Sequence, residues 1–461
     1  MALINQFDPK NREMLENIQG NILKSHGREH ALLLFIDGLP NKSKEVKKWL
    51  AWLAESKQIV SCYDQLKDIN AWKSKNIDGG TFTCIHISYN GYEYLLGEAV
   101  ADNLTGTFTD FKGGMKNAAL NDNIDHFEHG IEEESHFLLI IANNNIGALH
   151  QQLEIIKLHL SNIATIKYIQ EGDAIKNNAG AGIEHFGYVD GVSQPIFFED
   201  ELKDYKNANG NPTQLKFDPS AEIGLVLVDD PYVRKANAYG SFIVFRKLEQ
   251  DVHGFKKAEH DLAVKLGLQG EDMERAGAMI VGRFEDGTPV QMSAEVGLIN
   301  NAVANDFDYP KNDESKCPFH AHTRKTNPRS DIGMEESKKH TMARRGIPYG
   351  KRNDNPNDGI LETKPVNGVG LLFMSYQAKI SNQFEVIQRE WANNETFHNG
   401  NTKDKIGLDL IIGQGSSTAK GAYATEWGKS KSIKQFSFDQ FVTTRGGGYY
   451  FAPSIPFLKN L

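Results

Sequence analysis

The sequence predicts an α+β protein made of two ferredoxin-like units, each an antiparallel sheet with helices at its periphery. Two observations lead to this fold class. Over the first 170 residues, strand-like and helix-like runs follow one another in the order β-α-β-(α)-β-α-β, which is the order of a ferredoxin-like unit. The second half shows a comparable order with long insertions, although the two halves share no visible sequence repeat.

The first unit is predicted from the spacing of its apolar residues. Residues 31–36 form a short apolar run, residues 82–88 alternate as a half-buried strand does, and residues 43–55 repeat apolar side chains at helical spacing. The expected strands are residues 31–36, 82–88, 137–142 and 164–169, and the expected helices are residues 43–55, 91–98 and 149–160.

The second unit is expected to contain strands at residues 241–245, 368–376 and 449–452 and helices at residues 256–266, 271–279 and 383–391. Polar connections at residues 171–182 and 203–214 precede it, and we place the domain boundary there, giving units of residues 1–215 and 216–461. Residues 322–365 and 413–434 show the least regular pattern. Because long irregular stretches are often functional, we expect chemistry in the first, and a surface insertion in the second.

Composition narrows the classes of function. The chain has 461 residues, a net charge of -9 and no block rich in Lys or Arg, which argues against a nucleic-acid partner. Its apolar runs are far shorter than the ~20 residues that a membrane helix needs. The three cysteines, Cys62, Cys84 and Cys317, are too few and too widely spaced for a disulfide framework. With no export signal visible, we expect a cytoplasmic protein that binds a small ligand.

The loop at residues 185–195 (HFGYVDGVSQP) is the strongest local candidate for a site. It sets Asp190 between two glycines and ends at a proline, which describes a tight, non-helical segment whose backbone can approach a ligand. Two readings stay open. Asp190 is either a catalytic carboxylate or the acceptor of a local turn that bonds only its own backbone.

Four further stretches accompany this loop in a fixed order: residues 17–28 (NIQGNILKSHGR), 317–329 (CPFHAHTRKTNPR), 344–350 (RRGIPYG) and 445–453 (RGGGYYFAP). Taken together, the five motifs resemble those of the dye-decolourising peroxidases, a family of haem enzymes, and the resemblance runs nearly from end to end. It implies the duplicated ferredoxin-like fold, with haem b bound in the C-terminal unit.

The resemblance identifies His322 as the axial ligand of the haem iron. A second histidine, His320, lies two residues earlier where the family has a small or apolar residue, and it is the rival candidate. A ligating histidine normally donates its other ring N–H to a carboxylate or carbonyl group. Glu385 and Glu390, on the helix expected at residues 383–391, are the candidates for that partner.

Four other residues are expected to contact the haem. Arg324 and Arg329 follow His322 closely, and planar guanidinium groups suit the two haem propionates. The alternative for each arginine is a surface position without a fixed partner. Leu371 and Phe373 match the apolar residues that line the distal pocket in the family, although plain core packing predicts the same alternation.

The resemblance assigns the distal catalytic roles to Asp190 and Arg344. Hydrogen peroxide must lose a proton from one oxygen and regain it on the other, which needs one group that is base and then acid. A fixed cation such as Arg344 stabilises the negative charge that develops on oxygen, whereas Arg345 is expected to be structural. An aspartate, with an ordinary pKa near ~3.9, is a competent base in mild acid, so activity should peak below neutral pH.

The sequence therefore predicts a haem-dependent peroxidase that reduces hydrogen peroxide to water while it oxidises dyes, phenolics or other small organic donors. The alternative is a haem-binding or haem-handling protein with incidental peroxidase activity. Such a protein would need His322 but would not need Asp190 and Arg344. The oligomeric state stays open, with a homodimer as one option.

Overall fold

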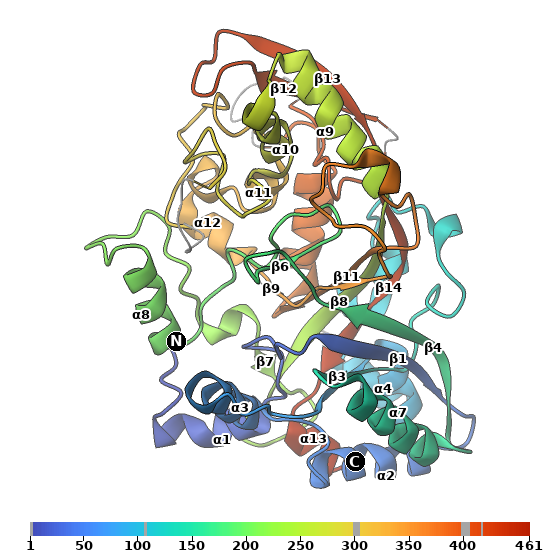
Figure 1. Ribbon diagram of the computed structural model, residues 1–461. Coiled ribbons are helices and arrows are strands. Elements are labelled where there is room, and N and C mark those ends of the chain that lie inside the picture. The colour runs from blue at the N-terminus through green and yellow to red at the C-terminus, as the bar shows by residue number, and fades with distance from the viewer. Residues whose placement is uncertain (1–2, 106–107, 298–304, 398–405, 416–417) are drawn as a thin grey trace.

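A computed structural model describes residues 3–105, 108–297, 305–397, 406–415 and 418–461 (Figure 1). The N-terminal unit contains strands β1 (His30–Gly38), β2 (Phe82–Ile87), β3 (Phe137–Asn143) and β4 (Ala164–Asp173). All are antiparallel, in the order β2-β3-β1-β4, which is the strand order of a ferredoxin-like sheet. Its helices are α1 (Arg12–Asn17), α2 (Ser43–Glu55), α3 (Cys62–Lys75), α4 (Tyr89–Leu96), α5 (Glu98–Thr105), α6 (Thr109–Gly113) and α7 (Ile146–Leu160).

The C-terminal unit repeats this arrangement with β8 (Tyr239–Gln250), β10 (Ile347–Tyr349), β11 (Gly370–Gln377) and β14 (Val442–Ala452), in the order β10-β11-β8-β14. The short β9 (Ala343–Arg344) also pairs with β11. Helices α9 (Val252–Leu266) and α10 (Glu274–Val281) and the π-helix η9 (Val386–Ala392) accompany this sheet. Besides short 3-10 helices, the remaining helices and strands of the described residues are β5 (Ile175–Lys176), β6 (Gly182–Ile183), α8 (Glu199–Ala208), β7 (Val228–Asp229), α11 (His322–Thr326), α12 (Met334–Lys339), β12 (Thr418–Ala424), β13 (Ile433–Asp439) and α13 (Ile455–Lys459). The predicted duplication is confirmed.

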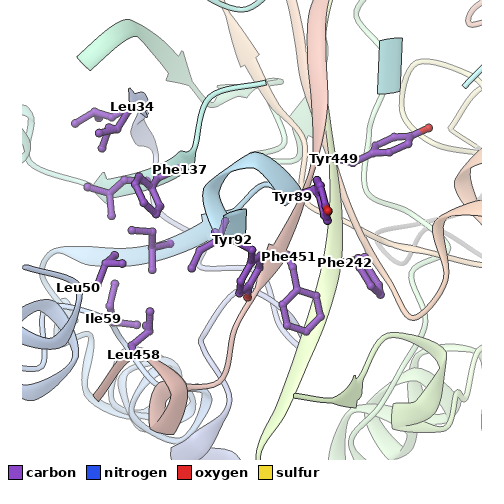
Figure 2. Close-up of a cluster of buried hydrophobic side chains, with 14 of the residues drawn as sticks. Leu34, Leu50, Ile59, Tyr89, Tyr92, Phe137, Phe242, Tyr449, Phe451 and Leu458 are labelled. Atoms are coloured by element: carbon purple, nitrogen blue, oxygen red, sulfur yellow. The ribbon is translucent and has the colours of Figure 1, made fainter. Parts of the chain in front are cut away.

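The two sheets join edge to edge. Phe451 of β14 pairs with Ile87 of β2, so both units share one continuous sheet. One apolar cluster spans the junction, and Figure 2 shows Phe451 of the C-terminal unit between Tyr92 of α4 and Phe242. Burial of such large aromatic side chains on both sides of a junction favours a fixed relation between the units.

Most predicted elements are present within a few residues of their expected ends, but three expectations fail. The polar connection expected at residues 203–214 begins inside α8, which ends at Ala208. The segment at residues 413–434 is not irregular, because β12 pairs with β13 as a hairpin that buries Tyr423 and Phe438. Residues 416–417 of that segment lie outside the described residues. Helix α3 is absent from the prediction because its sequence has few apolar residues; Ser61 caps it by accepting a bond from the N–H of Asp64.

A contact between distant segments of the fold helps to position the candidate site. The segment at residues 18–29, which follows α1, is not helical, and its carbonyl groups at Asn21 and Ile22 accept bonds from Arg345. This contact ties the N-terminal segment to the residue after β9 and fits the structural role expected for Arg345.

In the described part of the chain, no helix is both long enough and apolar enough to cross a membrane.

Candidate active site

A large cavity lies against the C-terminal sheet. It measures about 1690 Å³ including its open mouth, and both halves of the chain line it. Its walls come from residues 184–193, helix α11, strand β11 and the π-helix η9, which are far apart in sequence. The cavity therefore forms only when the whole chain folds.

His322, the first residue of α11, lines the cavity. Its Nδ1 lies 2.8 Å from Oδ2 of Asp409, whose side chain is fully buried. The other carboxylate oxygen of Asp409 accepts bonds from the backbone N–H groups of Ile411 and Ile412 at 2.8 and 2.9 Å. Burial alone would lower the pKa of His322, but the Asp409 carboxylate outweighs it and the pKa is raised. Because Nδ1 is occupied, Nε2 is the ring nitrogen left for a ligand.

The Asp190 loop forms another part of the cavity boundary. Gly187 and Gly191 have φ values of +98° and +77°, and Ser193 has φ +62°, so the backbone takes conformations that favour glycine. The side chain of Asp190 is exposed at the cavity, and Oδ1 accepts a bond from the N–H of Gly191 at 2.6 Å. Both readings of this aspartate therefore have a basis: it bonds its own turn, and it also lines the cavity.

Arg344 in β9 is fastened to the same loop. Its Nη2 donates to the carbonyl oxygen of Val192 at 2.9 Å, and the side chain of Gln194 bonds both backbone groups of Arg344 at 3.0 and 3.2 Å. Leu371 and Phe373 of β11 also line the cavity, while Leu372 between them belongs to the core on the other face. The structure thus brings together six of the seven predicted site residues: Asp190, His322, Arg329, Arg344, Leu371 and Phe373.

Known proteins resemble this chain in sequence. The family model described as "Dyp-type peroxidase, C-terminal" matches residues 202–405. The multifunctional dye peroxidase DyP2 of Amycolatopsis sp. is 39% identical over 461 residues, which cover 97% of this chain and 96% of that protein. This chain belongs to the DyP-type peroxidase family. The dye-decolorizing peroxidase AauDyP1 of Auricularia auricula-judae is 31% identical over 69% of this chain and 64% of that protein.

Solved structures of DyP-type peroxidases share the fold of this one. DyP2 from Amycolatopsis sp. has a TM-score of 0.91 at 37% identity and covers 100% of this chain and 99% of that one. The DyP-type peroxidase of Anabaena sp. has a TM-score of 0.89 at 36% identity over 99% and 96% of the two chains. As a DyP-type peroxidase, the chain is a haem-dependent enzyme that oxidises dyes and other organic donors. The enzyme prediction is confirmed over the haem-handling alternative.

Three observations indicate that the cavity of this DyP-type peroxidase fits a haem. A histidine backed by a carboxylate presents one free ring nitrogen, and apolar side chains such as Leu371 and Phe373 offer a surface for a flat macrocycle. Two lining arginines, Arg283 and Arg329, form no ion pair with any carboxylate of the described residues. Arg329 Nε is also buried without a hydrogen-bond partner in the described chain. Such cations suit the carboxylates of a porphyrin.

Arg324 does not take the place expected for it. Its guanidinium group is fully buried outside the cavity lining and binds Asp331 through Nε and Nη2 at 2.7 and 2.9 Å. Its Nη1 donates to the carbonyl oxygen of Cys317 at 2.6 Å. The expectation that Arg324 contacts a propionate is therefore not supported, because an internal carboxylate already satisfies it. Arg283, which no motif singled out, lines the cavity and, like Arg329, forms no ion pair with a carboxylate of the described residues.

The candidates for the second contact of His322 also need correction. Glu385 accepts a bond from the hydroxyl of Tyr449 at 3.0 Å, and Glu390 pairs with Arg389, so neither reaches His322. Asp409 fills that role, and the signal for it was a single acid inside the apolar run at residues 408–412 (LDLII). The rival ligand His320 is fully buried against Tyr423, at 4.9 Å between ring centroids, and does not line the cavity.

Proposed function

We propose that His322 is the axial ligand of the haem, that Asp190 is the acid and base for peroxide, and that Arg344 stabilises the charge that develops on peroxide oxygen. The observation that carries this proposal is that the three side chains line one cavity from three separate segments. When bound, haem supplies the redox-active iron that passes electrons from organic donors to peroxide.

The roles of the protein groups follow from their contacts. Asp190 is exposed at the cavity, so it can take a proton from one peroxide oxygen and return it to the other. Arg344 is held by Val192 and Gln194 of the same loop, which keeps its guanidinium group near that reaction. Leu371 and Phe373 line the same cavity and offer no proton donor or acceptor, so neither of them competes with Asp190 for the proton of peroxide. Arg329, with Arg283, is proposed to bind the propionates.

Substitutions at Asp190 and Arg344 test this assignment. We expect Asp190→Asn to slow the reaction of the enzyme with peroxide by about 10²–10⁴-fold, since a general acid-base group is lost. Arg344→Leu should slow it by about 10²–10³-fold, since one preorganised charge is lost. Stopped-flow mixing with peroxide measures both rates. The exposed Asp204 on α8 gives the control Asp204→Asn, which should react as the wild type does.

The pH profile gives a second measurement of the same assignment. With Asp190 as base, the wild type should be most active toward electron-rich donors below neutral pH, and Asp190→Asn should lose this acid maximum. Rapid peroxide reaction in both variants, or a flat profile from acid to alkaline pH in intact wild-type enzyme, would contradict the proposed roles.

Several finer assignments are proposals with their own support. We propose haem b as the cofactor, with hydrogen peroxide and small organic donors as substrates, on the strength of family membership and the cavity. The chain is proposed to act in the cytoplasm, since Cys62, Cys84 and Cys317 are all free and buried. We propose a division at residues 1–215 and 216–461, with the first unit supplying the Asp190 loop. A homodimer stays a prediction that light scattering would test.

A further inference from the structure

Two of the buried arginines at the cavity share one neutral acceptor. Oδ1 of Asn305 accepts a bond from Nη2 of Arg283 at 2.8 Å and from Nη2 of Arg329 at 2.7 Å. Arg329 is 1% exposed and Arg283 is 6% exposed, so neither charge is well hydrated. Burying two cations that share one uncharged acceptor costs free energy, unless an anion binds to both of them.

Two other buried arginines of the same region show the contrast. Arg246, which also lines the cavity, binds both carboxylate oxygens of Asp122 at 2.8 and 2.6 Å. Arg324 binds Asp331 in the same bidentate way. Those two charges are neutralised inside the protein. The remaining contacts of Arg283 and Arg329 in the described chain are carbonyl oxygens and aromatic rings, with no carboxylate among them.

The orientation of the Asn305 amide is set by its neighbours. Its Nδ2 donates to Oγ of Ser193 at 3.3 Å, and Asn327 donates to the same hydroxyl at 3.1 Å. The opposite orientation would point an NH₂ group at two guanidinium groups, which can only donate. The amide oxygen therefore faces the arginines. Through Ser193, the same amide also touches the Asp190 loop.

Burial disfavours the charged form of both arginines. It lowers the pKa of Arg283 to about 10, with the charge of Arg329 adding to the effect, and it lowers the pKa of Arg329 as well. Arg329 is stacked on the rings of Phe307 and Phe217, at 3.7 and 4.0 Å from their centroids. Both guanidinium groups are thus held in fixed positions, and no carboxylate of the described residues forms an ion pair with either of them. The carboxylates of Asp306 and Asp308 act on the charge of Arg329 only from beyond ion-pair distance.

We propose that Asn305 is a positioning residue that holds Arg283 and Arg329 through a neutral oxygen and so reserves both charges for the carboxylates of the porphyrin. This inference rests on the proposed haem site. An aspartate at residue 305 would have the same shape but would neutralise the two arginines within the protein, as Asp331 does for Arg324. The amide is therefore a determinant of affinity for a dianionic ligand.

The isosteric substitution Asn305→Asp tests this idea, because a structural role and a charge role predict different results. We expect the apoprotein of the variant to melt at a temperature equal to or above that of the wild type, since two buried cations gain a counterion. We expect its affinity for haem to fall by about ten- to a hundredfold, the range seen when groups behind ligand-binding residues are changed. Calorimetry on the apoprotein and haem titration measure the two effects.

The dimethyl ester of haem is the matched probe, because it lacks both negative charges and keeps the ring. Asn305→Asp should bind the ester as tightly as the wild type does. Gln151→Glu, an exposed amide-to-carboxylate change on α7, controls for the added net charge and should leave both affinities unchanged. Equal haem affinity in Asn305→Asp and wild type, or an equal loss for haem and its ester, would overturn the inference.

A second variant covers the case in which Asn305→Asp does not fold. Asn305→Ala removes the shared acceptor without adding charge, so the guanidinium groups lose their common direction. The wild type should prefer haem over its ester by about tenfold or more, and Asn305→Ala should lose much of this preference. An unchanged preference would count against Asn305. If the wild type itself forms no histidine-ligated haem complex, the proposed function fails instead, so the two failures are distinguishable.

Discussion

The two sides of the cavity are built in opposite ways. On one side, His322 is fixed by Asp409, which is buried and held in turn by two backbone N–H groups. On the other side, Asp190 is exposed. Within the described residues, its carboxylate accepts a hydrogen bond only from the backbone N–H of the next residue, Gly191. One side is a chain of buried contacts, and the other is a carboxylate within reach of solvent.

This difference matches the two tasks proposed for the cavity. An axial ligand has to keep one ring orientation and one tautomer, which buried second contacts provide. A proton shuttle has to meet water and peroxide, so its carboxylate cannot be locked into the core. The positive φ value of Ser193, close to Asp190, shows that the exposed loop is nevertheless held in an unusual conformation. Rigidity and access are thus divided between the two sides.

The largest effect should come from removing the fixed side altogether. We expect His322→Ala to lose the absorption spectrum of histidine-ligated haem and to lose peroxidase activity by at least about a hundredfold, since no other lining residue offers an imidazole. Absorption spectroscopy of the haem-loaded protein and a steady-state assay measure these losses. His320→Ala is the matched control, because that ring is buried outside the cavity, and it should keep the spectrum. The reverse result would make His320 the ligand.

A smaller effect is expected from loosening the fixed side. Asp409→Asn leaves His322 in place but removes the carboxylate from its Nδ1, so we expect haem affinity or activity to fall by about ten- to a hundredfold. Resonance Raman spectra of the ferrous protein should show a weaker iron–histidine bond. Glu385→Gln is the control, since Glu385 contacts Tyr449 rather than His322. If Glu385→Gln weakened the bond as much, the contact with Asp409 would not be the one that matters.

Local sequence patterns predicted much of this architecture. The alternation at residues 368–376 places Leu371 and Phe373 on one face of β11, and the structure has both at the cavity. Helix α2 has the bounds that its periodicity predicted. These successes have one cause: a period of two or of 3.6 depends only on neighbouring residues. The roles of the cavity residues stay predictions that the substitutions above test.

The contacts that local patterns could not predict are those between distant segments. Asp409 lies 87 residues after His322, and nothing near His322 indicates which acid will reach it. Arg324 and Arg329 look equivalent in sequence, yet Asp331 neutralises Arg324 and leaves Arg329 at the cavity. Asn305 likewise meets its arginines only after folding. Pairing of buried charges is a property of the folded chain, because it depends on which side chains exclude water together.

The smallest predicted effect concerns what keeps the exposed side in shape. Glu184 lines the cavity, and its two carboxylate oxygens accept bonds from the backbone N–H groups of Phe186 and Tyr188 at 2.9 and 3.0 Å. In Glu184→Gln one of these acceptors becomes a donor, so the loop that carries Asp190 should loosen. We expect activity to fall by about two- to tenfold, comparable with the loss of one hydrogen bond, with little change in haem affinity. Parallel activity and haem titrations measure this split.

The pH dependence of stability gives this substitution a second signature. Burial raises the pKa of Glu184, so the folded state favours its protonated form. The stability that Glu184 contributes is therefore full below about pH 4.3, the ordinary value for glutamate, and is lost as the pH rises through its higher folded pKa. The difference in unfolding free energy between wild type and Glu184→Gln apoproteins should shrink from mildly acid to neutral pH in urea titrations. Glu55→Gln, an exposed control at the end of α2, should show no such trend, and a constant difference for Glu184→Gln would mean that the loop is held by other contacts.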